Sequence, residues 1–148
     1  MRKLYVLYDE DCGFCRRVQR WLIEQRQYVT LIPLARQSIA ARQMFGPVID
    51  SAGDDEMIVV SDEGQIWRGT HAYLVCMWAL RRTRRWSFRL ARPSLRPLVR
   101  GAFATLARNR YALSKLMGAS DDRQLVGELR RREPPRCTSV PAADTGFK

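Results

Sequence analysis

The chain has 148 residues, of which 46% are hydrophobic, and it carries a formal net charge of +11. This length and composition exclude a disordered polymer and fit one domain that buries a core without disulfide staples. No run of 18 apolar residues is present, so we expect no membrane-spanning helix, and four cysteines are too few for a disulfide scaffold. The N-terminal residues lack the pattern of a secretory signal, so we expect a cytoplasmic protein.

The charge is divided unevenly along the chain. Residues 1–80 hold 9 basic and 10 acidic residues, whereas residues 81–137 hold 16 basic and 4 acidic residues. This asymmetry indicates an anionic partner for the second part, either an anionic membrane surface or an acidic protein. Nucleic acid is the less favoured partner, because no helix-turn-helix, RNP or zinc-finger pattern accompanies the arginines. A solvated basic face without a partner is the alternative.

Alternating strands and helices are predicted over the first 80 residues. The apolar patterns predict strands at residues 4–8, 28–32, 57–61 and 65–68. They predict helices from residue 12 to about residue 27, at 36–45 and at 70–80. We expect Pro33 to close the second strand, Gly46 and Pro47 to end the second helix, and Thr70 to cap the third. A β-α-β beginning followed by a hairpin gives an α/β fold with a small mixed four-stranded sheet and helices on both faces.

The remaining residues are predicted to be helical. Apolar residues at helical spacing predict helices from residue 93 to 106 and from 109 to 117, with a last, polar helix at 121–132. The Pro-rich end is predicted to be a mobile tail. We therefore expect a core at 1–83, a basic C-terminal helical extension packed on the core at 84–132, and a disordered tail at 133–148.

The clearest chemical feature is the segment Asp9-Glu10-Asp11-Cys12-Gly13-Phe14-Cys15, which lies where a strand passes into a helix. Two cysteines three residues apart on a first helical turn are close enough to form a disulfide. The helix N-terminus stabilises a thiolate over a thiol, so the pKa of Cys12 is expected to fall below about 8.5. We expect Cys12 to be the accessible nucleophile and Cys15 to be the less exposed, resolving thiol.

The segment YDEDCGFC resembles the DxxCxxC signature of the DCC family of thiol-disulfide oxidoreductases, with Asp9, Cys12 and Cys15 at the three positions that give the family its name. IVVSDEGQIWRGTHAY resembles a second block of this family and ARNRYALSKLMG a third, so the resemblance covers roughly residues 3–118. It implies a thioredoxin-like fold. Thioredoxin folds usually place a cis-proline before the third core strand. Either Pro47 or another residue takes that place here.

Four further residues near the motif or on the third predicted helix are candidate site residues. Asp9 either holds the loop before the helix or accepts a proton from Cys15. Phe14 either packs inward or docks an apolar part of the substrate. Thr70 and His71 are candidate substrate contacts, by analogy with the helix N-terminus at which glutaredoxins bind the glutathione carboxylate. A solvent-facing His71 is the alternative.

Three functions remain open from the sequence. The preferred one is a thiol-disulfide oxidoreductase without a cofactor, which acts on a protein or small-molecule disulfide or thiol, with glutathione as one candidate. The second is a zinc module that uses Cys12 and Cys15 with His71, Cys76 or Cys137. Against it, Cys76 belongs to an apolar helical stripe and is expected to be a core residue, and Cys137 is expected to be a free thiol in the tail. The third is a basic module for anionic surfaces with an idle CxxC.

Overall fold

The computed structural model describes residues 1–53, 56–116, 127–129 and 131. The strands are β1 (Lys3–Tyr8), β2 (Thr30–Ala35), β3 (Ile58–Ser61) and β4 (Ile66–Arg68). The helices are α1 (Gly13–Glu24), α2 (Ile39–Asp50), α3 (Thr70–Ala79), α4 (Arg84–Leu90), α5 (Arg96–Arg108) and α6 (Arg110–Leu116). The predicted tail with Cys137 and most of the predicted helix at 121–132 lie outside the described residues.

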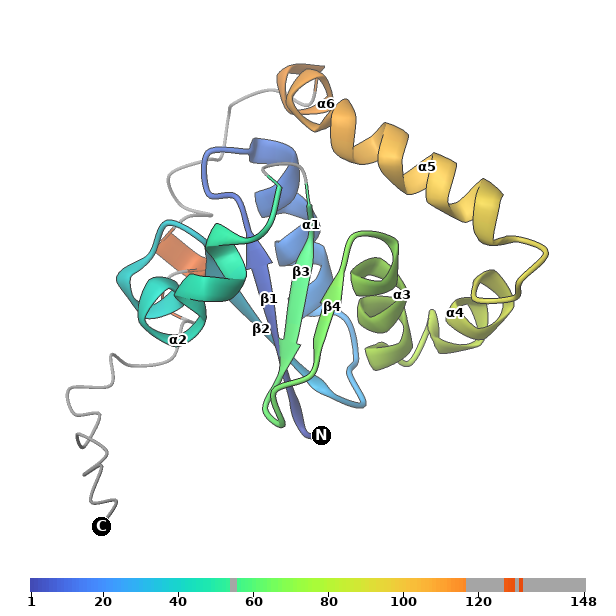
Figure 1. The fold of residues 1–148 in the computed structure, drawn as a ribbon, viewed down its shortest axis with the longest axis horizontal. Coiled ribbons are helices and arrows are strands. Elements are labelled where there is room, and N and C mark those ends of the chain that lie inside the picture. Colours follow the sequence, from blue (N-terminus) through green and yellow to red (C-terminus); the bar gives the residue numbers. More distant parts are fainter. Residues whose placement is uncertain (54–55, 117–126, 130, 132–148) are drawn as a thin grey trace, which may run out of the picture.

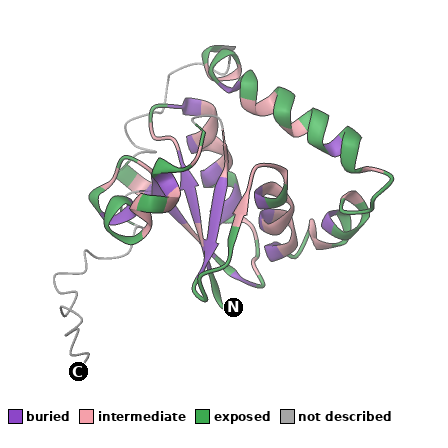
Figure 2. Cartoon of the chain, in the orientation of Figure 1, coloured by how far each residue is buried: buried purple, intermediate pink, exposed green. Residues whose placement is uncertain are grey.

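The four strands form one mixed sheet in the order β2-β1-β3-β4. β1 pairs in parallel with β2 and antiparallel with β3, which in turn pairs antiparallel with β4. Leu4 and Val6 of β1 pack with α1 and α3 on one face, and Leu7 packs with α2 on the other (Figure 1). Buried residues accordingly concentrate in the strands and in the helix sides that face them (Figure 2). This arrangement confirms the predicted fold class and is consistent with a thioredoxin-like fold.

The second strand differs from its prediction at both ends. β2 begins at Thr30, because the backbone N–H of Tyr28 donates to the carbonyl of Ala79 at 2.8 Å and not to a strand. It then continues through Pro33, which stands opposite Val6 of β1. The expectation that Pro33 closes the strand is wrong because β2 is an edge strand, where a missing N–H is tolerated.

The second helix likewise runs past the residues that were expected to end it. α2 continues through Gly46 and Pro47 to Asp50, with a kink at Phe45, whose φ of −134° lies outside the helical region. After such a kink the chain begins a new helical turn, and proline is well tolerated in a first turn because its missing N–H has no helical partner there. The kink therefore allows Pro47 to lie inside a helix of 12 residues.

The turn into α3 depends on a glycine. Gly69 precedes the helix with φ 53° and ψ −126°, a backbone conformation that residues other than glycine rarely adopt. Thr70 is already the first helical residue, so the predicted cap at Thr70 is wrong, and His71 is the second helical residue. The glycine conformation turns the chain directly from β4 into α3, which leaves no separate capping position for Thr70.

We expect Gly69→Ala to lower the free energy of unfolding by about 1–3 kcal/mol, because a side chain is strained at this φ and ψ. Crowding plays no part, since the nearest heavy atom to an added Cβ is Glu56 Oε1 at 3.8 Å. Gly46→Ala in α2, with nothing within 4 Å, is the matched control and is expected to be neutral or stabilising by up to about 1 kcal/mol. Urea unfolding compares the two variants, and equal losses would contradict the argument.

The residues after α3 run along one side of the core. α4 and α5 pack on α3, and α6 packs on α1 (Figure 1). Tyr73 of α3 stacks on Phe103 of α5, with ring centroids 4.4 Å apart. The sequence did not predict α4, because RRWSFRL has no apolar periodicity. In the described part of the chain no helix has the length and apolar character needed to cross a membrane.

Candidate functional site

Cys12 and Cys15 form a disulfide at the point where β1 passes into α1, with their Cα atoms 5.2 Å apart. Cys12 is the N-cap residue of α1, and its Sγ accepts a hydrogen bond of 3.2 Å from the backbone N–H of Cys15. The first turn of α1 contains no acidic residue. The N-terminus of a helix stabilises a thiolate over a thiol, and the lowered pKa expected for Cys12 stays a prediction.

The exposure of the two cysteines is the reverse of the expectation. Cys12 is fully buried, with 0% relative exposure, whereas Cys15 is partly exposed. The expectation that Cys15 is the less exposed of the two is therefore wrong for the disulfide form. α6 packs on α1 and binds Asp9, three residues before Cys12.

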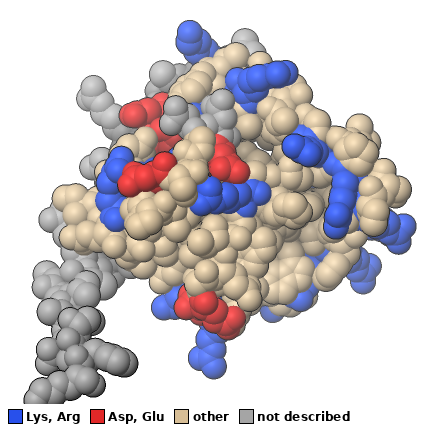
Figure 3. Space-filling model, viewed as in Figure 1, with Lys and Arg blue, Asp and Glu red and all other residues tan. Residues whose placement is uncertain are grey.

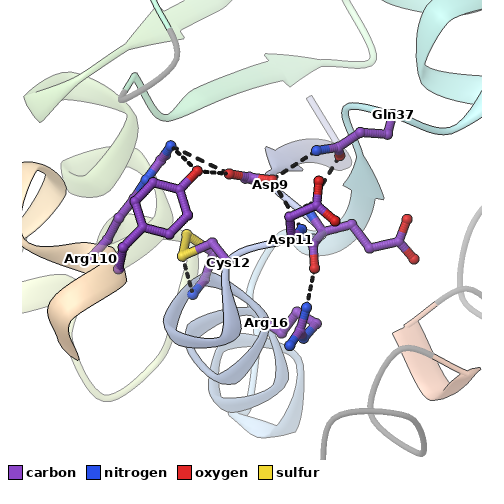
Figure 4. The surroundings of a disulfide bond; sticks show 9 residues. Asp9, Asp11, Cys12, Arg16, Gln37 and Arg110 are labelled. Atoms are coloured by element: carbon purple, nitrogen blue, oxygen red, sulfur yellow. Dashed lines mark hydrogen bonds and ion pairs between the residues drawn. A yellow bond between two sulfur atoms is a disulfide. The ribbon is translucent and has the colours of Figure 1, made fainter. Parts of the chain in front are cut away.

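Asp9 is the centre of the polar contacts around the disulfide (Figure 4). Its Oδ1 accepts hydrogen bonds from Gln37 Nε2 at 2.7 Å and from the backbone N–H of Asp11 at 3.0 Å. Its Oδ2 accepts a hydrogen bond of 2.7 Å from the Tyr111 hydroxyl and lies 3.3 Å from Nη2 of Arg110. The side chains of Asp9 and Arg110 are only 12% and 8% exposed, so this ion pair is shielded from water.

These contacts determine the protonation of Asp9. Burial by itself raises the pKa of this carboxyl group, but the hydrogen bonds from Tyr111, Gln37 and Asp11 and the charge of Arg110 outweigh burial and lower the pKa. The bond to Asp9 also raises the pKa of the Tyr111 hydroxyl, because its proton is held against an anion. A carboxylate stabilised in this way is a weak proton acceptor, which favours the loop-holding interpretation of Asp9.

Two more side chains fix the loop between β1 and α1. Gln37, which donates to Asp9, also accepts a hydrogen bond of 3.2 Å from the backbone N–H of Glu10. Arg16 of α1 is buried and donates to the carbonyl of Glu10 (Figure 4). The loop that carries Cys12 is thus tied to α1, to α6 and to the residues after β2.

The sequence missed Gln37, Arg110 and Tyr111 as parts of the site. The third block of the resemblance, ARNRYALSKLMG, contains Arg110 and Tyr111 and was the one available signal for them. Gln37 had no such signal, since a single glutamine in a loop belongs to no recognisable motif.

An apolar cavity of about 300 Å³ lies beside Cys15, between α1, α3 and α5. Phe14, the residue between the two cysteines, lines this cavity together with Trp21, Phe103 and Leu106. Phe14 is therefore partly exposed on an apolar surface beside the disulfide. Phe14 lies among the residues that line this cavity, and a substrate in the cavity would contact the same ring. The structure therefore does not separate inward packing from contact with an apolar substrate.

The residues directly before β3 also face this cavity. Glu56 and Met57 line it, whereas Pro47 lies within α2. Residues other than proline therefore take the place before the third core strand, and the described residues contain no cis peptide bond.

The structure does not bring Thr70 and His71 to the disulfide. They line a different, wider hollow of about 900 Å³ between α3 and α5, together with Arg96 and Arg100. His71 is exposed, as its solvent-facing alternative requires. Their role as substrate contacts stays a prediction.

Cys76 is a core residue of α3, with 2% relative exposure. Burial raises the pKa of its thiol to about 12, so it holds its proton at physiological pH. In the part of the chain that the structure describes, no three His, Cys, Asp or Glu side chains are grouped as metal ligands. The set that the zinc interpretation drew from Cys12, Cys15, His71 and Cys76 is thus not assembled.

We expect Cys76 to resist alkylation in the folded protein after the disulfide has been reduced. Iodoacetamide at neutral pH should label the reduced Cys12–Cys15 pair but leave Cys76 unlabelled, because only a thiolate reacts and the Cys76 thiol is buried and protonated. Labelling in urea, followed by peptide mass mapping, should then add the modification at Cys76. Labelling of Cys76 to the same extent as the Cys12–Cys15 pair without urea would show that Cys76 is accessible.

Comparison with known proteins identifies the family of the chain. No curated protein and no solved structure matches it. The family model described as DCC1-like thiol-disulfide oxidoreductase matches residues 6–116, from β1 to the end of α6. The match includes both cysteines of the disulfide and the residues of α6 that bind Asp9. The chain therefore belongs to the DCC1-like thiol-disulfide oxidoreductase family.

Proposed function

We propose that the protein is a thiol-disulfide oxidoreductase in which Cys12 and Cys15 alternate between a dithiol and a disulfide. The observation that carries the proposal is the position of Cys12 Sγ, which is bonded to Cys15 and accepts the Cys15 N–H at the N-cap of α1. This position lowers the free energy of the Cys12 thiolate. It therefore favours Cys12 as the nucleophile of the dithiol form.

The exchange proceeds in two steps that balance in electrons and protons. The Cys12 thiolate attacks one sulfur of a substrate disulfide, forms a mixed disulfide and releases the other substrate sulfur as a thiolate. The Cys15 thiolate then attacks Cys12 Sγ, forms the Cys12–Cys15 disulfide and releases the second substrate sulfur. The protein loses two electrons and two protons, and the substrate disulfide gains them. The reverse sequence oxidises a substrate dithiol.

Access to Cys12 requires a change in the contacts of α6. Cys12 is fully buried in the disulfide form, and α6 is held near it by the bonds of Arg110 and Tyr111 to Asp9. We infer that α6 moves from the beginning of α1 when Cys12 reacts. Asp9 is then a positioning residue, since its carboxylate anchors α6 and its lowered pKa makes it a poor proton acceptor for Cys15.

The cavity beside Cys15 supports a substrate with an apolar group next to its reactive sulfur. Its lining is apolar over most of its surface, and its volume of about 300 Å³ lies at the lower end of the range for ligand pockets. A large side chain of a substrate protein and an apolar small-molecule thiol both fit this description. Glutathione is less well supported, because the residues proposed to bind it line the other hollow.

A redox titration tests the proposed function. The protein is equilibrated in mixtures of oxidised and reduced glutathione and, for lower potentials, of oxidised and reduced dithiothreitol. Its free thiols are then alkylated, and the mass shift is measured. We expect one two-electron transition, mapped by peptide mass to Cys12 and Cys15 and absent from Cys12→Ser. A pair that stays reduced in every mixture would overturn the proposal, as would zinc bound stoichiometrically to these cysteines.

A further inference from the structure

A second surface with a distinct composition lies on α4 and α5. Residues 64–120 contain 12 basic residues and no aspartate or glutamate. Eight arginines after α3 are exposed: Arg81, Arg82, Arg85, Arg89, Arg92, Arg96, Arg100 and Arg108. None of these eight forms an ion pair with a described residue. We propose that this surface, here called the arginine face, docks the protein on an anionic lipid bilayer.

The charges of the molecule are separated in space as well as in sequence. Figure 3 shows basic side chains without acidic neighbours over the α4–α5 side, whereas acidic side chains lie over the α2 side and at the turn between β3 and β4. A surface of one sign creates a field that attracts an extended surface of the opposite sign. An anionic bilayer is such a surface, and each basic residue close to it adds to the attraction.

Exposed apolar side chains stand among these arginines. Trp86 and Phe88 of α4 are 55% and 60% exposed, and Leu98 of α5 is 71% exposed. Ser87, between the two aromatic residues, is buried, so α4 faces the core at this position. Successive helical residues are rotated by about 100°. Arg85 and Arg89 are therefore directed away from the core, with Trp86 and Phe88 on either side of them.

This combination favours a lipid surface over other anionic partners. Tryptophan and phenylalanine enter the boundary between lipid headgroups and acyl chains, while arginines remain with the phosphates. Arg89 already lies over the Trp86 ring, 5.3 Å from its centroid, so the charge and the aromatic group are held together. The exposed Leu98 side chain can insert among acyl chains, whereas it has no ring on which a nucleic acid base could stack.

Binding to vesicles tests the proposal. The full chain is sedimented with vesicles of phosphatidylcholine alone and with vesicles that contain phosphatidylglycerol. We expect binding only to the anionic vesicles, weakening as salt is added. Arg85→Gln combined with Arg89→Gln should reduce binding roughly 20- to 30-fold, from about fivefold per arginine. Brominated lipids should quench the fluorescence of the protein, and Trp86→Phe should lose most of this quenching.

Matched substitutions on the opposite side of the sheet serve as controls. Ile39 of α2 is 54% exposed, close to the value for Trp86, and Arg42 of α2 is also exposed. Ile39→Ala and Arg42→Gln should leave vesicle binding unchanged. All variants should keep the wild-type rate of disulfide exchange, because none of these residues belongs to the site around the cysteines. A failure of the docking proposal is therefore distinguishable from a failure of the proposed redox function.

Three results would overturn the proposal. The first is equal binding to neutral and anionic vesicles. The second is unchanged binding by the double arginine variant. The third is tighter binding to a nucleic acid duplex or to an acidic peptide than to anionic vesicles at the same ionic strength, with no quenching of Trp86 by lipid.

Discussion

Cys12→Ser is expected to lose at least about 10³-fold of the disulfide exchange rate, whereas Cys15→Ser is expected to accumulate a mixed disulfide with the substrate. The first variant lacks the sulfur that the N-terminus of α1 stabilises as a thiolate. The second keeps that nucleophile but lacks the thiol that resolves the intermediate. Reduction of a model disulfide followed by mass spectrometry measures both the rate and the trapped species.

The same experiment decides which cysteine attacks. Cys15 is the more exposed residue in the disulfide form, so a mixed disulfide trapped by Cys12→Ser and not by Cys15→Ser would assign the attack to Cys15. Cys76→Ser is the control for the loss of a cysteine as such. Because Cys76 is buried in the core of α3 with a raised pKa, this variant should exchange disulfides at the wild-type rate.

Asp9→Asn should lower the free energy of unfolding by about 2–3 kcal/mol, because Arg110 loses its charged partner in a nearly buried position. It should also increase the rate at which dithiothreitol reduces the Cys12–Cys15 disulfide, since α6 is anchored more weakly. Asp50→Asn is the matched control. Asp50 forms an exposed ion pair with Arg42, and its loss is expected to cost no more than about 0.5 kcal/mol.

The effect of Asp9→Asn is expected to depend on pH. The pKa of Asp9 is lower in the folded protein than in the unfolded chain, where it is about 3.9. The carboxylate therefore contributes stability above the unfolded value, and this contribution is lost as the pH falls through the lower, folded value. Urea unfolding should show the difference between wild type and Asp9→Asn at neutral pH and a smaller difference in acid. A difference that does not change with pH would show that the charge of Asp9 is not involved.

The sequence by itself determined the local features of this protein. These features depend only on residues that are close together in the sequence, so they could be predicted without the fold. They are the apolar run of β1, the two cysteines after it and the helical spacing from Phe14 onward. They placed Cys12 at the beginning of α1, and the β-α-β order with a hairpin gave the mixed sheet. The resemblance added the redox family, which the match over residues 6–116 confirms.

Only the tertiary structure decided which of the two cysteines is buried and which distant residues bind Asp9. Tyr111 binds Asp9 across 102 residues of chain, and the cavity beside Cys15 is assembled from three separate helices. The position of β2 at the edge of the sheet likewise decided that Pro33 lies within a strand. Periodicity and capping patterns report on residues a few positions apart. Burial and ion pairing depend on which elements pack together, and that is settled when the whole chain has folded.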